Sequence, residues 1–473
     1  MSSPRFTSLE HRRLATSGIL VALAGIVFLV VLQALMRPYA TDGLYFQGWS
    51  SERLMQTVSL EDLRDHPFQT LDNIHIQPPL LDTLRAILVH FTSPGDSATA
   101  LHSVDFLIFQ IWVILYGLFG FLVFWWTAGF TGPRIGLVAA VVFLLHPATI
   151  FYATLLDTTL LTAFLIAVFY HLLWKLYRGD KVAGWQLAVA VLALLFTKPI
   201  FQWPFLLIMV PVLLLLGLGR RQVLVFSLIA GGVFGLYIAK QHHHFGLWTT
   251  SSFTGLNLTR SAGIDETDHF LGYLDESASP EGPTVGEPAV LTRKHQLTGD
   301  PNFNHTDYLE LNRQLIAEYR NYLKTTPFRE LVLSYAENLK IYFRPSSVYT
   351  PHALVDRLPW RPVFDRLFSW PVLVLLLVLA GGTWLAGSRR HGGYGKRIGL
   401  LIPGLFIFLV TVLFEKGENM RFKYFLEPVM LVFIFSQLDA GRRLARRALP
   451  GRRALAVAKE GKGVRFDAGP PEA

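Results

Sequence analysis

FLIFQIWVILYGLFGFLVFWWTAGFTGP, the stretch from residue 106 to residue 133, contains no charged residue. A helix needs about 20 apolar residues to cross a hydrocarbon core of about 30 Å. The stretch is longer than that requirement, and it therefore predicts a transmembrane helix. This single segment already favours a membrane protein over a soluble one.

The composition of the whole chain agrees with that prediction. The chain has 473 residues, of which 52% are hydrophobic and only 16% are charged, whereas soluble domains carry about 25% charged residues. No cysteine is present, which excludes disulfides, Cys-ligated zinc, thiol nucleophiles and iron–sulfur clusters. We expect an integral membrane protein that uses none of these chemistries.

Nine further apolar stretches approach the same length. Together with 106–133 they predict an all-α polytopic membrane protein with about ten transmembrane helices. The first stretch follows Arg12 and Arg13 but has no small-residue cleavage site after it, so we expect a retained helix rather than a signal peptide. The nine stretches are 14–36, 135–156, 158–174, 182–197, 199–219, 222–239, 367–388, 398–414 and 424–438.

The distribution of basic residues predicts the orientation. With the N-terminus in the cytoplasm, the inside segments hold 22 of the 43 Lys and Arg residues, although the outside segments are more than twice as long. This bias follows the positive-inside rule. The net charge of +9 is then mostly a cytoplasmic anchor, and we expect no nucleic-acid partner.

Six segments follow from the spans and the orientation. Both long hydrophilic regions face outward, and the basic tail either lies on anionic headgroups or serves only as a topology anchor. The segments are the N-terminus with the first helix (1–36), a first outer loop (37–102), helices two to seven (103–239), a large outer insertion (240–369), helices eight to ten (370–439) and a basic cytoplasmic tail (440–473).

Each outer region contains predicted helices. After Pro78 and Pro79, an apolar face that runs from Leu80 to Phe91 and an opposite face with Asp82 and Arg85 indicate a helix lying along the membrane surface. In the second region, 266–304 has the composition of a loop. Two helices follow it, one over 307–324 and one that starts at Thr326 and Pro327.

Polar residues near the spans gather at the predicted outer ends. This position suits chemistry at the outer surface better than passage of a solute through the bilayer. Basic side chains at headgroup height can hold a lipid-linked phosphate as it leaves, and a carboxylate can deprotonate an acceptor hydroxyl. The residues are Asp42, Asp157, Lys198, Glu415, Glu418, Arg421 and Lys423.

Each of these residues also has a structural interpretation. Asp42 fits a turn, Asp157 can cap the fourth span, and Lys198 can extend to the interface. Arg421 and Lys423 can be ordinary flanking charges. The three histidines at 242–244 fit a solvated patch better than a metal site, because consecutive side chains do not point the same way.

The order of these motifs resembles the GT-C superfamily, polytopic glycosyltransferases that use polyprenyl-phosphate sugars and include protein O-mannosyltransferases and the aminoarabinose transferases of lipid A. The resemblance covers about the first 220 residues and the last spans. The motifs that carry it are TDGLY at 41–45, HIQPPL at 75–80, the segment from His146 through Tyr152 to Asp157, LFTKP at 195–199 and RFKYFLEP at 421–428.

The resemblance implies a GT-C-like fold and an inverting transfer of one sugar from a polyprenyl-phosphate donor to an acceptor hydroxyl. Asp42 would be the general base, and Lys198, Arg421 and Lys423 would bind the donor phosphate. Gly43 replaces the family's usual second acidic residue, so no metal ligand is assigned and a divalent metal stays open. Further pocket candidates are Tyr45, His75, Arg85, Asp157, Arg260 and Glu418.

The implied partners are the lipid-linked donor, a lipid, glycan or protein acceptor, and membrane lipids. The implied place is a bacterial inner (plasma) membrane, with the site facing the periplasm or exterior. Two alternatives remain. A transporter or flippase of lipid-linked sugars predicts inverted repeats and broken helices, which are not evident in the sequence, and a non-catalytic assembly factor for envelope glycans would use the same scaffold.

Overall fold

Every regular element in the described part of the chain is a helix, which confirms the prediction of an all-α protein. Apolar helices of membrane-spanning length are among them, as a multi-pass membrane protein requires. The computed structural model describes residues 8–36, 51–54, 57–92, 97–264, 302–349, 352, 354–387 and 394–448.

Five helices are long and apolar enough to cross a membrane alone, and up to seven spans result if two bent helix pairs are each counted as one. The pairs are α6 (Pro133–Leu144) with α7 (Pro147–Thr154), bent by 55°, and α16 (Arg361–Leu367) with α17 (Val372–Gly387), bent by 52°. The five are α1 (Ser8–Met36), α5 (Ser97–Thr131), α8 (Thr159–Tyr177), α11 (Arg220–Phe245) and α18 (Tyr394–Phe414).

The count of ten spans stays a prediction. Three of the predicted spans correspond to helices that are either shorter than a bilayer requires or charged at both ends. α9 (Gly184–Leu195) and α10 (Trp203–Leu215) have 12 and 13 residues. At 1.5 Å per residue each reaches only about 20 Å. α20 (Glu427–Ala448) is long enough, but charged residues occur at both ends of it.

Glycines let the first membrane helices approach closely. A Cβ atom at Gly117 of α5 would lie 2.7 Å from the carbonyl oxygen of Ala22 on α1. One at Gly136 of α6 would lie 2.9 Å from the amide nitrogen of Ala128 on α5. Small residues at helix contacts are typical of membrane bundles, because apolar side chains gain little from leaving lipid and close packing must hold the helices together.

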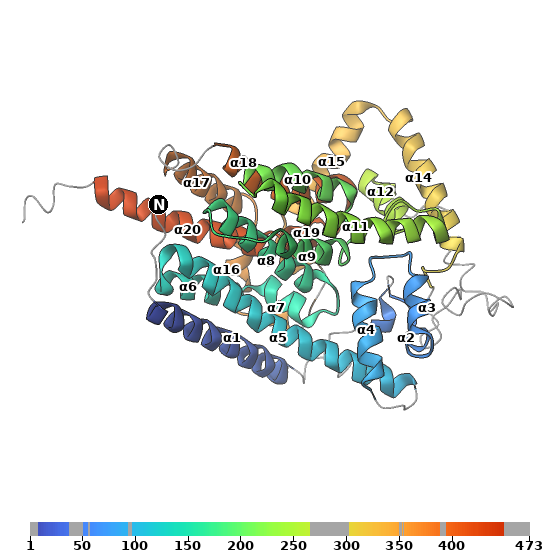
Figure 1. Ribbon diagram of the computed structural model, residues 1–473, viewed down its shortest axis with the longest axis horizontal. Helices are drawn as coiled ribbons and strands as arrows, with labels where there is room; N and C mark the ends of the chain where they lie inside the picture. The colour runs from blue at the N-terminus through green and yellow to red at the C-terminus, as the bar shows by residue number, and fades with distance from the viewer. Residues whose placement is uncertain are drawn as a thin grey trace, which may run out of the picture.

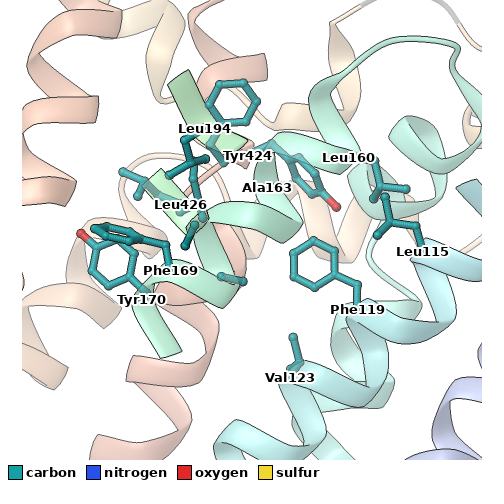
Figure 2. Close-up of a cluster of buried hydrophobic side chains, with 14 of the residues drawn as sticks. Leu115, Phe119, Val123, Leu160, Ala163, Phe169, Tyr170, Leu194, Tyr424 and Leu426 are labelled. Carbon is teal, nitrogen blue, oxygen red and sulfur yellow. The ribbon is translucent and has the colours of Figure 1, made fainter. Parts of the chain in front are cut away.

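Figure 2 shows how α5 faces α8 in the main apolar cluster, with Leu115 and Phe119 directed towards Leu160 and Ala163. The Phe119 ring also meets Phe143 of α6 with ring centroids 4.5 Å apart. Aromatic pairs at this separation add to the packing energy of the cluster. α5 is therefore the central helix to which α1, α6 and α8 are attached.

The helices of the two regions predicted to face outward, the outer regions, gather at one end of the bundle, and the C-terminal end of α20 lies at the opposite end (Figure 1). The first region contains η2 (Ser51–Arg53), α2 (Leu60–Asp65), α3 (Pro67–Asp72) and α4 (Leu80–His90). The second contains α12 (Thr254–Ala262), α14 (Asp307–Thr325), α15 (Phe328–Tyr342), η4 (Ser346–Val348) and η5 (Val355–Arg357), and α19 (Asn419–Tyr424) joins α18 to α20.

Backbone groups join the outer regions to the ends of the membrane helices. The amide of Leu80 donates to the carbonyl of Phe196, 3.0 Å away, just after α9. Asn338 of α15 donates to the carbonyl of Val412, 3.2 Å away, in the last turns of α18. The end of α9 therefore contacts the first outer region, and the end of α18 contacts the second.

The α14–α15 hairpin agrees with the sequence pattern to within two residues, and α4 begins directly after Pro79 as predicted. The orientation of α4 differs from the prediction. Its polar residues Asp82 and Arg85 are fully buried against α2, while Ile87 and Phe91 are exposed. The physical reason is that the first outer region buries an ion-pair network beside its small apolar cluster of Val58, Leu63, Ile74 and Ala86.

Because α1 and α5 approach each other closely, alanine substitutions at two glycines of α5 should affect the stability of the protein differently. Gly117→Ala should lower the stability of the detergent-solubilised protein by about 1–3 kcal/mol, the usual cost of overpacking. Gly129→Ala is the matched control, because a Cβ atom there meets nothing within 4 Å. Thermal unfolding of both variants checks this, and equal midpoints would contradict the helix contact.

Candidate functional site

Four segments that are far apart in the sequence bring ionisable side chains together where the membrane helices meet the outer regions. They are the start of α8, the turn between α9 and α10, the connection from α18 to α19, and the segment after η4. Predicted site residues that meet here are Asp157, Lys198, Glu418 and Arg421.

Arg421 holds these segments together. Its guanidinium forms ion pairs with Asp157, 3.2 Å away, and with Glu418, 2.8 Å away. Its Nε donates to the Thr159 hydroxyl over 2.9 Å. Burial lowers the pKa of the guanidinium, but the two carboxylates outweigh that effect and hold the pKa well above its ordinary value. Arg421 is therefore a fixed positive charge.

Asp157 has both of the roles that the sequence suggested. Its carboxylate accepts hydrogen bonds from the amide and from the hydroxyl of Thr159, in the first turn of α8. The same carboxylate pairs with Arg421. Asp157 thus caps α8 and positions Arg421, and much of its hydrogen-bonding capacity is already used.

Tyr349 completes the setting of Arg421 and was not among the predicted residues. Its hydroxyl donates to Glu418 over 2.8 Å, and the Arg421 guanidinium lies 5.4 Å from the centre of its ring. This distance is within the range of a cation–π contact. The outer insertion therefore contributes directly to the site, although nothing in its sequence pattern indicated this tyrosine.

Lys198 differs from Arg421 because nothing neutralises it directly. The residue is only 6% exposed, and its ammonium makes no hydrogen bond or ion pair with any residue that the structure describes. Buried ammonium groups are costly unless an anion pairs with them. This unpartnered charge beside a fixed arginine is the geometry of an anion-binding site.

The pKa of the Lys198 ammonium reflects the same energetic cost of burial. Burial lowers the pKa of its ammonium to about 8, and the positive charge of Arg421 lowers it further. Asp157 and Glu418 act in the opposite direction but do not compensate. An anionic ligand would stabilise the protonated form and raise this pKa again, so Lys198 is suited to bind one.

Lys423 has a structural position that does not support the predicted phosphate contact. Its ammonium is fully buried and donates to the carbonyls of Arg344 and Phe368, 2.7 and 2.8 Å away. Glu427 lies 3.2 Å from it. An ammonium has three protons, and these three partners take all of them.

Arg85 and His75 also lie in structural networks of the outer regions. Arg85 is fully buried and pairs with Glu52 and Asp82 at 2.9 and 2.8 Å. His75 approaches Ser252 with its Nδ1 at 2.9 Å, and burial lowers the pKa of its imidazole to about 3. His75 is therefore neutral and joins the first outer region to the second.

Three further residues were predicted to belong to the site, namely Arg260, Asp42 and Tyr45. Arg260 of α12 lies close enough to influence Glu415 of the site electrostatically. Asp42 and Tyr45 lie outside the described residues. The proposed base is therefore known from the sequence alone.

No group of three or more His, Asp or Glu side chains is arranged to hold a metal ion in the described ranges. The histidines at 242–244 have other partners. His242 stacks on Trp248 with ring centroids 4.2 Å apart, and His244 lies 3.3 Å from Asp72. The site described above is built from cations and carboxylates instead.

Comparison of the chain with protein-family models, with curated protein sequences and with solved structures finds no match. The functional interpretation therefore depends on the geometry of the site and on the sequence motifs.

Substitution of Lys198 and of Lys423 by methionine should have different effects on the stability of the protein. Lys423→Met leaves Glu427 and two carbonyls without a buried partner and should cost about 3–5 kcal/mol of stability. Lys198→Met removes an unpaired buried charge and should cost nothing or stabilise the protein. Thermal unfolding in detergent measures both. A large loss in Lys198→Met would mean that Lys198 has a structural partner.

Proposed function

We propose that this protein is an inverting membrane glycosyltransferase. It would transfer one sugar from a polyprenyl-phosphate donor to an acceptor hydroxyl at the outer face of the membrane. The proposal joins the GT-C-like motifs of the sequence to the charges assembled at the ends of the membrane helices. It includes the predicted GT-C-like fold and a bacterial inner membrane as its place.

The observation that carries the proposal is Lys198, which is 6% exposed, lies in the electrostatic range of Arg421 and has no partner for its ammonium among the described residues. A donor phosphate held at headgroup height by a membrane-embedded lipid would reach the ends of the membrane helices. It would supply the missing counter-ion of Lys198 and accept remaining hydrogen bonds from Arg421. Asp157 and Glu418 act as positioning residues, because both already hold the guanidinium.

The proposed chemistry is a direct displacement. Asp42 removes the proton of the acceptor hydroxyl, and the resulting oxygen nucleophile attacks the anomeric carbon from the side opposite the phosphate. The bond between that carbon and the phosphate oxygen breaks, and the oxygen keeps the electron pair. Lys198 and Arg421 stabilise the negative charge that develops on the leaving phosphate.

A second candidate, a flippase of lipid-linked sugars, is favoured by one observation. The pairs α6–α7 and α16–α17 are bent by more than 50°, and broken membrane helices are typical of transporter binding sites. The sequence had not indicated these breaks. Conversion of a polyprenyl-phosphate sugar by purified protein in detergent, without a sealed compartment, would separate a transferase from a flippase.

Asp42→Asn should abolish sugar transfer, because an amide cannot accept the proton of the acceptor hydroxyl. Binding of the donor should change less than about threefold, since the phosphate contacts come from other residues. Transfer assays and donor-binding measurements on the same detergent preparation test this. Asp72→Asn is a control, because Asp72 interacts with the C-terminal end of α11. Full activity of Asp42→Asn would refute the assignment of the base.

Donor affinity should fall as the pH rises through about 8. Lys198 has a lowered pKa, so its charge is present below about pH 8 and is lost above it. A polyprenyl-phosphate sugar is a phosphodiester with one negative charge throughout this range, so the ligand contributes no titration. Glu415 of the same site also has a pKa of about 8, so the profile is measured in a Glu415→Gln background. There Lys198→Arg should retain affinity up to about pH 9.5, because an arginine stays protonated. An unchanged profile in that variant would argue against Lys198 as the titrating group.

A further inference from the structure

Glu415 is a buried carboxyl group that the proposed reaction does not use. It follows directly after α18 and is 6% exposed. Asn419 fixes its backbone by donating to the carbonyls of Glu415 and Thr411 over 2.6 and 2.9 Å. The turn passes through Gly417 with φ of +87°, a conformation that other residues rarely adopt. The position of Glu415 is therefore well defined.

The charged neighbours of Glu415 are those of the candidate site. Glu418, Arg260 and Arg421 all influence it electrostatically, and Glu415 in turn influences Lys198. No described side chain forms an ion pair or a hydrogen bond with its carboxyl group. The backbone of Lys416 donates a hydrogen bond to it. Glu415 and Lys198 are thus two buried ionisable side chains in one site, and neither has a side-chain partner among the described residues.

Glu415 and Glu418 differ in how much of their hydrogen-bonding capacity is already used within the protein. Glu418 already accepts hydrogen bonds from Arg421 and from the Tyr349 hydroxyl, both over 2.8 Å. Burial raises the pKa of the Glu415 carboxyl to about 8, and the negative charge of Glu418 raises it further. Near neutral pH Glu415 is therefore mostly a carboxylic acid, which can both donate and accept hydrogen bonds.

We propose that Glu415 is a specificity-determining residue that binds a hydroxyl group of the sugar whose phosphate Lys198 and Arg421 hold. This inference rests on the proposed function. The ligand class is a sugar with free hydroxyls on a phosphate group. A polyprenyl phosphate without a sugar would occupy the cationic part of the site and leave the acidic O–H of Glu415 without an acceptor, because its backbone contact with Lys416 uses the carboxyl group only as an acceptor.

The physical reason for a preference is the cost of an unsatisfied buried polar group. A site built to hydrogen-bond a hydroxyl discriminates strongly against a ligand that lacks it, because the buried partner then stays unpaired. Glu415 would therefore favour the sugar-bearing donor over the polyprenyl phosphate that is released. This difference would also help the product to leave after transfer.

The test measures two dissociation constants for each variant of the full-length protein in detergent, at pH 7. The probes are undecaprenyl phosphate and, from a panel of undecaprenyl-phosphate mannose, glucose and arabinose, the ligand that the wild type binds best. The wild type should bind that sugar-bearing probe about tenfold more tightly than undecaprenyl phosphate. Glu415→Ala should reduce this ratio to about one while the affinity for undecaprenyl phosphate changes less than twofold.

Two variants control the measurement. Glu415→Gln should keep most of the preference, because an amide also donates and accepts, and it tests the proposal if the alanine variant fails to fold. Glu330→Ala removes an exposed carboxylate of α15 and should change neither constant.

Three results would overturn the inference. An unchanged ratio in Glu415→Ala would show that the carboxyl group does not contact the sugar. An equal loss of affinity for both probes would assign Glu415 to the phosphate site. If the wild-type protein bound neither probe, the proposed function itself would fail, and this result is distinguishable from the first two.

Discussion

The ion pairs of Arg421 with Asp157 and Glu418 are the interaction on which the candidate site depends. A guanidinium can remain buried only when carboxylates or other acceptors replace the water that it has lost. Because Asp157 directly precedes α8, Glu418 precedes α19 and Tyr349 belongs to the outer insertion, one side chain joins three distant segments. Because these carboxylates are paired with Arg421, Lys198 has no counter-ion among the described residues. Binding of an anion at the site would therefore be favourable.

Buried charges serve a different purpose in the first outer region and where α19 meets α20. Arg85 with Glu52 and Asp82, and Lys423 with Glu427, form ion pairs within the protein. These ion pairs orient the outer helices over the ends of the membrane helices. A buried charge that has its counter-ion in the protein is structural, whereas one that has none among the described residues indicates a ligand. This distinction separates Lys198 from Lys423, although both lysines precede or follow a predicted span at its outer end.

The helices themselves were largely predictable, because long apolar stretches and proline positions act locally. The α14–α15 hairpin and the start of α4 at Leu80 follow from such signals. The direction in which α4 faces was not predictable, since an amphipathic pattern does not say whether its polar side meets water or a buried partner. The break between α6 and α7 occurs at His146 and Pro147, where an N-cap followed by proline could have indicated a new helix start.

The sequence by itself determined that this is an all-helical chain with apolar helices of membrane-spanning length and without cysteine chemistry. It also singled out polar residues at the predicted outer ends of the spans, namely Asp42, Asp157, Lys198, Glu415, Glu418, Arg421 and Lys423. Hydrophobicity, length and charge bias are properties of short segments, so they can be read without coordinates. Only the tertiary structure decided which of the charges have partners, because pairing depends on contacts between residues more than 200 positions apart, such as Arg421 with Asp157. Contacts of this kind assign Lys423 to the structure and bring Tyr349 into the site, and they leave Lys198 without a counter-ion among the described residues.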